Sequence, residues 1–503
     1  MRAGRTIARF ALSIGIAFPC LLPVIVVAQE GEPRHPAIVH FEEIGRLSSD
    51  PGELWALGDI SGDGIDDFAT EHYLDTCLQP SRCAQEILIH YGVKNGLPTL
   101  DNAFHLKSTT LLSKMLIRAV GDWDGKNGSD LCVHLRTYND TAFGNANLVY
   151  TDIDRTVIFW NQGDGTYSFS DTTELYPGVR STFGTLEGVA GDFNNDGQDD
   201  LVVRSYKDVL YEGKGKKIPT LHIYLGGDNK EDQRHGMSHV PQWQWWNLPS
   251  YVSRLESQDL DHDGAQDLIL YVNEANAPLT VFYGRKDNQL PDTISDRQQI
   301  QINGLASVFS DVTGDNYADL VILNSAQDFV YCYVSTPSAR RLQEMFGTGN
   351  DPPREGEWWS RPWATLKGPK LVNQFWFGLG SELYPLGSAD TSSPDEIWVT
   401  SWPYILVYRT GVRLDSLIDA EIDTRGVGET PVRLGDINGD GRDELAMVGN
   451  PTVIFRLPDA LPSTVGRARK VPDGTDTPDS VSGVEECLTE EVWKATTTTM
   501  NLW

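Results

Sequence analysis

The chain has 503 residues, of which 40% are hydrophobic, so it is long enough to bury a large core. It carries 71 acidic and 41 basic residues, which gives a formal net charge of −30. This charge argues against a nucleic-acid-binding protein, because such proteins need a basic surface. Solubility and clustered acidic metal ligands explain the acidity better than an acidic docking surface does.

The first 28 residues have the composition of a signal peptide. Three arginines precede an apolar run over residues 10–28, and Ala28 before Gln29 fits a small-residue cleavage site. An uncleaved anchor is the alternative, because the run is close to membrane-spanning length, but two prolines within it favour removal. We expect the mature chain to be secreted or extracytoplasmic, in the periplasm or at the cell surface, without a transmembrane span.

A nine-residue acidic loop recurs along the chain and is clearest at Asp192–Asp200, DFNNDGQDD. Side-chain oxygens stand at positions 1, 3, 5 and 9, Gly197 allows a sharp turn at position 6, and position 7 offers its carbonyl. An EF-hand is excluded, because position 12 is Val203 and both flanks are β-branched and apolar like strands. The pattern predicts a calcium loop within a β-hairpin.

Five copies keep this pattern, and we expect them to bind about five calcium ions. Their expected ligands, at positions 1, 3, 5, 7 and 9, are Asp59, Ser61, Asp63, Ile65 and Asp67; Asp192, Asn194, Asp196, Gln198 and Asp200; Asp259, Asp261, Asp263, Ala265 and Asp267; Asp311, Thr313, Asp315, Tyr317 and Asp319; and Asp436, Asn438, Asp440, Arg442 and Glu444. Asn316 replaces Gly at position 6 of the fourth, a mild change because Asn tolerates left-handed backbone.

Two further copies are degenerate. Asp122–Asp130 carries Lys126 at position 5, and Ser388–Glu396 keeps the frame but few ligands. We hypothesise that the Lys126 ammonium takes the place of calcium and pairs with Asp122, Asp124 and Asp130.

The seven copies lie 48 to 77 residues apart, a spacing typical of propeller blades. The repeated loop resembles the FG-GAP (VCBS-like) repeat of the integrin α-subunit propeller, and the resemblance covers roughly residues 37–457. It implies an all-β fold: a seven-bladed β-propeller of four-stranded antiparallel blades with calcium-binding loops between strands 1 and 2.

Ring closure is predicted from the two ends of this region. Ile38–Ile44 alternates like a strand and is expected to be the outer strand of the last blade. The other three strands would be Val432–Leu434, Leu445–Val448 and Val453–Phe455, so that no edge is left exposed.

Several insertions interrupt the blades. Long loops between strands 2 and 3 are predicted at residues 72–85, 137–155 and 205–219, and the longest insert, at residues 336–369, contains a short helix over Pro337–Phe346. Six tryptophans are candidates for a sugar- or protein-contacting surface, or else pack the insert onto the propeller: Trp243, Trp245, Trp246, Trp358, Trp359 and Trp363.

Cysteines and the C-terminal tail complete the organisation. Cys77 and Cys83 could form a disulfide in an oxidising compartment, whereas Cys132 and Cys332 lie in strand-like runs and are equally well explained as buried thiols. Residues 464–503 are acidic and rich in Thr, and we expect a disordered tail.

Catalytic motifs are weak. His235 and His239 lie four apart without the HExxH pattern of a metalloprotease, and His262 occupies a variable, solvent-exposed loop position. We therefore predict an exported, calcium-binding, non-catalytic recognition or adhesion module whose partner is a protein or glycan at the cell surface. The alternative is a secreted polysaccharide or phosphoester hydrolase or lyase with its site in the propeller loops.

Overall fold

The structure is a computed structural model, and it describes residues 39–458 except for gaps. The gaps are 48–50, 74–84, 108–112, 127, 138–152, 176–186, 212–213, 228–234, 247–251, 273–277, 293–294, 302–303, 334, 336–363, 368–381, 388–394, 402–403, 409–419, 426–427, 429 and 450. All described residues lie in the second of the chain's two units, Ala37–Trp503.

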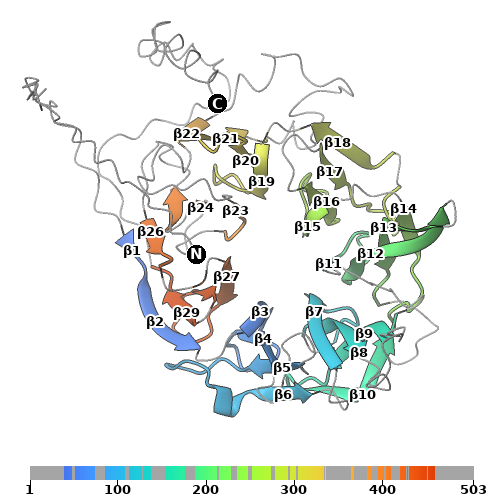
Figure 1. Cartoon of the computed structure of the whole chain (residues 1–503), viewed down its shortest axis with the longest axis horizontal. Helices are drawn as coiled ribbons and strands as arrows, with labels where there is room; N and C mark the ends of the chain where they lie inside the picture. The colour runs from blue at the N-terminus through green and yellow to red at the C-terminus, as the bar shows by residue number, and fades with distance from the viewer. Residues whose placement is uncertain are drawn as a thin grey trace, which may run out of the picture. The chain divides into compact units, whose positions relative to one another are not determined.

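The described chain forms seven sheets that follow one another around a ring, which makes a seven-bladed β-propeller (Figure 1). Blade 1 contains β3 (Pro51–Gly58), β4 (Asp67–Tyr73), β5 (Gln85–His90) and β6 (Phe104–Lys107). Blade 2 contains β7 (Ser113–Gly121), β8 (Asp130–Thr137), β9 (Ile153–Asn161) and β10 (Tyr167–Glu174). Blade 3 contains β11 (Glu187–Gly191), β12 (Asp200–Tyr211), β13 (Lys214–Tyr224) and β14 (Trp243–Trp246).

The remaining blades repeat this order. Blade 4 contains β15 (Val252–Gln258), β16 (Asp267–Val272), β17 (Pro278–Phe282) and β18 (Arg297–Gln301). Blade 5 contains β19 (Gly304–Ser310), β20 (Asp319–Asn324), β21 (Phe329–Tyr333) and β22 (Ala364–Lys367). Blade 6 contains β23 (Leu383–Tyr384), β24 (Ile397–Ser401), β25 (Tyr404–Tyr408) and β26 (Ala420–Asp423). Blade 7 contains β27 (Thr430–Gly435), β28 (Glu444–Val448) and β29 (Thr452–Arg456).

Strand 1 of each blade lies toward the centre of the ring and strand 4 toward the outside (Figure 1). Neighbouring strands within these blades are antiparallel, as the resemblance implied. Within the described ranges the only helical element is the three-residue 3-10 helix η2 (Leu100–Asn102).

Seven hydrophobic clusters hold the ring together, one between each pair of neighbouring blades. Successive residues of strand 2 face opposite neighbours: Val202 packs toward blade 4 and Val203 toward blade 2. This explains why the strands that follow the acidic loops are continuously apolar, because both faces of each sheet are buried.

The N-terminal part of the described chain closes the ring. Strand β2 (Glu42–Leu47) pairs antiparallel with β29 and becomes the outer strand of blade 7, as predicted, although it begins and ends later than Ile38–Ile44. The strand β1 (Val39–His40) pairs in parallel with β26, so blade 6 has a fifth strand that the prediction lacked. Phe41 lies between the two strands and is buried in the cluster that joins blades 6 and 7. Its burial holds the chain where it passes from blade 6 to blade 7.

One predicted loop is wrong. Residues 205–219 were expected to connect two strands of blade 3, but β12 and β13 continue through them and remain paired from Ser205↔Thr220 to Tyr211↔Lys214. The continued pairing satisfies the backbone that a loop would leave to solvent. The predicted helix at Pro337–Phe346 lies outside the described residues.

Candidate metal loops

The five intact acidic loops share one hydrogen-bond frame centred on the carboxylate at position 1. In the loop of blade 3, Asp192 Oδ1 accepts from the amide of Asp196 at 3.0 Å, and its Oδ2 accepts from Gly197 at 2.8 Å. Asp59, Asp259, Asp311 and Asp436 make the same pair of contacts with positions 5 and 6 of their own loops. The first carboxylate therefore folds the loop around itself.

Position 5 continues this frame. Its Oδ1 accepts from the amide of position 7 in every intact loop, at 2.9 Å from Ile65, 3.0 Å from Gln198, 2.9 Å from Ala265, 3.0 Å from Tyr317 and 3.1 Å from Arg442. At position 3, Asn194 and Asn438 each accept the amide of position 5 through their side-chain oxygen. These bonds give the five loops a common backbone conformation.

Two positions require left-handed backbone. Position 6 has φ between +65° and +98°, with Asn316 at the lower value, which agrees with the predicted tolerance of Asn. Position 4 is also left-handed, with Gly62, Asn195, His262, Gly314 and Gly439 at φ between +53° and +79°. Sequence reasoning missed position 4, although the preference for Gly and Asn there was visible in the aligned copies.

The carboxylate at position 9 joins the loop to the rest of its blade. Asp267 is fully buried; its Oδ2 accepts from Leu260 at 2.8 Å and its Oδ1 accepts from Gly284 at 2.8 Å. The other aspartates at this position likewise bond to position 2 and to the end of strand 3 or the connection that follows it: Asp67, Asp130, Asp200 and Asp319. Loops 1–2 and connections 3–4 therefore share one face of the propeller, as predicted.

Burial makes these carboxylates hard to ionise without a nearby cation. Desolvation raises the pKa of Asp200, Asp319 and Glu444 to about 8 and that of Asp67 to about 6, although backbone hydrogen bonds oppose the shift. The charged aspartates at positions 1 and 5 add to the shift for Asp200 and Asp319. A cation in the loop would reverse this effect, because an opposite charge favours the ionised form.

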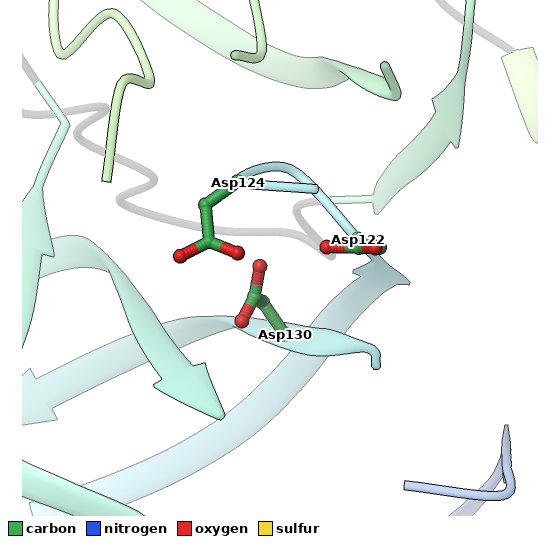
Figure 2. Close-up of side chains that lie close together, drawn as sticks. All are labelled: Asp122, Asp124 and Asp130. Carbon is green, nitrogen blue, oxygen red and sulfur yellow. The ribbon is translucent and has the colours of Figure 1, made fainter. Parts of the chain in front are cut away.

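Among the described residues, two sets of three aspartates lie close enough together to hold a metal ion, and one of them belongs to an intact loop. Oxygens of Asp259, Asp261 and Asp267 lie within 4.8 Å of one another, and those of Asp122, Asp124 and Asp130 do the same (Figure 2). The first set belongs to an intact loop, and its all-oxygen donors suit a hard cation. The second set belongs to the loop that the sequence marked as degenerate.

Residues 144–203 match the family model of the FG-GAP-like repeat, and the match includes β9 to β11 and the loop Asp192–Asp200. Within this segment the chain is similar to the FG-GAP-like repeat, and the described chain has the seven-bladed propeller fold that the resemblance implied. No curated protein matches it significantly.

Two solved structures with a similar fold are crystals of BBS1N in complex with ARL6DN, soaked with mercury or with lead. Both are 10% identical to this chain and cover 97% of their own chain. They cover 84% and 83% of this chain, with TM-scores of 0.40 and 0.43.

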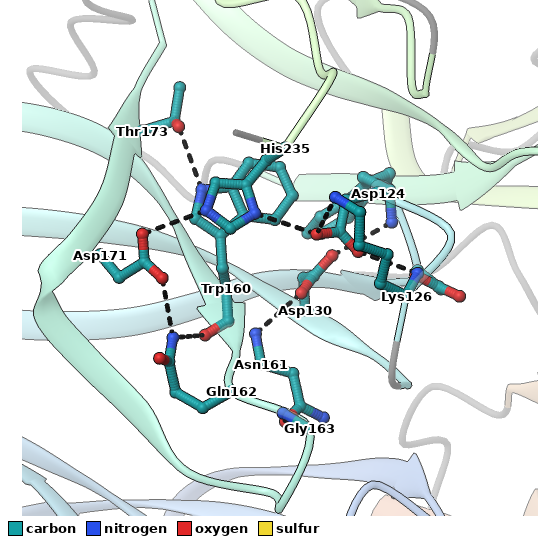
Figure 3. Close-up of polar contacts among 12 residues, drawn as sticks. Asp124, Lys126, Asp130, Trp160, Asn161, Gln162, Gly163, Asp171, Thr173 and His235 are labelled. Atoms are coloured by element: carbon teal, nitrogen blue, oxygen red, sulfur yellow. Dashed lines mark hydrogen bonds and ion pairs between the residues drawn. The ribbon is translucent and has the colours of Figure 1, made fainter. Parts of the chain in front are cut away.

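The degenerate loop of blade 2, Asp122–Asp130, has a lysine and a histidine beside its aspartates. The Lys126 ammonium lies 3.3 Å from Asp124 Oδ2 (Figure 3). The Lys126 backbone amide donates to Asp122 Oδ1 at 3.1 Å. The predicted ammonium contact with Asp124 is therefore present, whereas the described bond to Asp122 comes from the backbone.

His235 supplies a second contact that sequence reasoning missed. It comes from the connection after strand 3 of blade 3, and its two ring nitrogens lie 2.9 Å from Asp124 Oδ2 and 3.0 Å from Asp171 Oδ1 (Figure 3). Its ring stacks on Trp160 with centroids 4.3 Å apart. The imidazole of blade 3 therefore contacts two carboxylates of blade 2 and joins the two blades.

The remaining candidate side chains fall into three groups. His262 is exposed, as predicted, and its ring contacts that of Tyr317 in the next loop. Trp243 and Trp245 pack edge-on against Phe282 in the cluster between blades 3 and 4, which favours the packing interpretation for these two. Cys132 and Cys332 are free, buried thiols.

Some predicted features lie outside the described residues. These are the Cys77–Cys83 disulfide, the side chain of Trp246, the cluster Trp358, Trp359 and Trp363, most of the loop Ser388–Glu396, the signal peptide and the tail. A search of the described chain for apolar helices long enough to cross a membrane found none.

Proposed function

We propose that the chain is an exported calcium-binding propeller that acts as a non-catalytic recognition or adhesion module. The observation that carries the proposal is the common frame of the five intact loops. Each loop holds its carboxylates at positions 1 and 5 with the same backbone bonds, so the frame is built five times from different sequences.

Calcium is the cation that these loops suit best. The side chains at positions 1, 3, 5 and 9 offer only oxygen, and position 7 can add a carbonyl. A flexible set of oxygen ligands favours calcium over magnesium, which demands a near-ideal octahedron and keeps its own waters. The family resemblance supports the same ion, and export would place the chain where calcium is abundant.

The proposed recognition role follows from which connections lie on each face of the propeller. The metal loops gather on the face that carries the 1–2 and 3–4 connections, which leaves the 2–3 and 4–1 connections of the opposite face to contact a partner. The partner class we propose is a protein or glycan at a cell surface, in line with the resemblance to the integrin propeller. Fold alone does not identify that partner.

The proposal is tested first by the metal content of the mature chain from residue 29 onward, with melting curves in calcium and in EDTA. We expect about five calcium ions per chain and a clear drop in melting temperature on chelation. Asp263→Asn should lose one ion, whereas Asp164→Asn, which removes an equal charge from an exposed turn outside the metal loops, should lose none. Absence of bound calcium together with unchanged melting would refute calcium binding.

Recognition needs a separate measurement. Labelled chain is applied in calcium to a glycan array and to cells before and after protease treatment. Binding to cells that is lost after protease supports a protein partner, and array binding supports a glycan. Failure to bind either the cells or the array would overturn the recognition role.

A further inference from the structure

We propose that the calcium loops of blade 7 (Asp436–Glu444) and blade 1 (Asp59–Asp67) bind calcium as a coupled pair, so that metal binding locks the seam of the ring. The inference rests on the proposed calcium binding and adds a regulatory consequence to it. The seam is the place where blade 7, from the C-terminal end of the propeller, meets blade 1.

The two loops exchange hydrogen bonds through a residue that sequence reasoning did not single out. Asp66, at position 8 of the blade 1 loop, accepts the backbone amide of Asp436 through Oδ2 at 2.8 Å. In return, the Asp66 amide donates to the carbonyl of Asp436 at 3.1 Å. Asp436 is the position 1 ligand of its loop, and Asp66 directly precedes Asp67, the position 9 ligand of the other.

The connection after strand 3 of blade 1 adds two more bonds across the seam. The amide of Val93 donates to the carbonyl of Ile437 at 3.0 Å, and the amide of Asn95 donates to that of Asn438 at 2.7 Å. The same connection is tied to its own metal loop, since Gly92 donates to Asp67 Oδ1 at 2.7 Å. Positions 1, 2 and 3 of one loop and position 9 of the other thus belong to a single network.

The backbone at the seam packs closely against the Asp66 side chain. Gly435 has φ +81°, and a Cβ at this residue would lie 2.1 Å from Asp66 Oδ2. The absence of a side chain at Gly435 therefore allows the two loops to approach closely enough for Asp66 and Asp436 to bond. If calcium fixes the backbone of Asp436, it also fixes Asp66 and hence Asp67, and by thermodynamic linkage the effect on affinity is reciprocal.

The same exchange occurs at the junction of blades 5 and 6, where Asp395 Oδ2 accepts the amide of Asp311 at 3.2 Å and the Asp395 amide donates to the carbonyl of Asp311 at 2.9 Å. Asp395 belongs to the degenerate loop Ser388–Glu396, so within the described chain only the seam joins two intact loops in this way. Gln266 donates its amide to the carbonyl of Asp192 at 2.8 Å, which joins the loops of blades 3 and 4 in one direction. At the next junction position 8 is Ala318, whose methyl side chain cannot accept a hydrogen bond from the loop of blade 4. The loop Asp311–Asp319 therefore serves as an internal reference, because position 8 gives it no such link to the calcium loop of blade 4 and its link to Asp395 leads to a degenerate loop.

The test follows each loop separately by hydrogen–deuterium exchange of the mature chain during a calcium titration. Asp440→Ala removes a ligand from the blade 7 loop only. We expect the calcium concentration that half-protects peptide 59–67 to rise by about fivefold, at the lower end of typical coupling between sites. The midpoint of peptide 311–319 should stay unchanged. The reciprocal variant, Asp63→Ala, should shift peptide 436–444 by the same factor.

Two variants of Asp66 separate the hydrogen bond from simple charge. Asp66→Asn retains an acceptor for the Asp436 amide and should keep the coupling, whereas Asp66→Ala should abolish it. If calcium protects the loops but Asp440→Ala leaves the midpoint of peptide 59–67 unchanged, the coupling is refuted and calcium binding stands. If calcium protects none of the five loops, both proposals fall.

Discussion

Asp267→Ala is expected to destabilise the propeller strongly even when no metal is bound. The Asp267 side chain is fully buried, and each of its oxygens accepts one backbone amide, from Leu260 and from Gly284. Alanine would leave both amides buried without a partner. Each such group costs about 1–3 kcal/mol, so the free energy of unfolding should fall by about 2–6 kcal/mol.

The assay is urea unfolding in EDTA, which removes any contribution from calcium. Asp164→Ala is the control, because it removes a carboxylate from an exposed turn and should change the free energy of unfolding by less than about 1 kcal/mol. Asp267→Asn, which retains one acceptor oxygen, should lie between the two. If Asp267→Ala unfolds at the same urea concentration as the wild type in EDTA, position 9 is not a structural link and the reasoning fails.

Three other perturbations test separate features of the loops. In EDTA the protein should be less stable at pH 9 than at pH 5. Burial raises the pKa of Asp200 and Asp319 to about 8, so the folded chain holds protons that the unfolded chain releases above about pH 4. The stability that these protons give the folded state is lost as the pH rises through 8. Saturating calcium should remove that loss, and higher stability at pH 9 in EDTA would contradict the assignment. Asn316→Ala should destabilise by about 1 kcal/mol at its left-handed φ of +65°, whereas Asn316→Gly should be near neutral; equal unfolding curves would refute this. Lys126→Asp should add one calcium ion per chain by atomic absorption, and an unchanged metal content would show that Lys126 does not take the place of calcium.

The repeated loop made most of the fold predictable. Its spacing indicated seven blades, and the apolar runs after each copy become strands buried on both faces, as Val202 and Val203 illustrate. Closure by an N-terminal strand was also predictable, because the C-terminal blade had only three strands of its own. The division of the N-terminal segment into β1 and β2 at Phe41 was not predictable, because it depends on packing against Trp398, which lies far away in the sequence.

The links between loops were beyond sequence reasoning for a similar reason. Asp66 looks like one more acidic residue in an acidic loop, and its role depends on a partner in another blade. His235 likewise gains its contacts from Asp124 and Asp171, which belong to a different blade. A single sequence gives local periodicity, whereas these contacts depend on how blades stack. Position 4 is the exception, because its Gly and Asn residues could have been noticed.

The pairing of β2 with β29 has a practical consequence for how the protein is produced. A chain started after Leu47 would lack β2 and leave the backbone of β29 as an open edge. Open edges recruit strands from other molecules, so such a truncation should give strand-exchanged dimers or aggregates in place of a monomer. Adding a synthetic peptide that spans residues 37–47 should restore the monomer. The last blade could then be completed by a separate peptide of eleven residues.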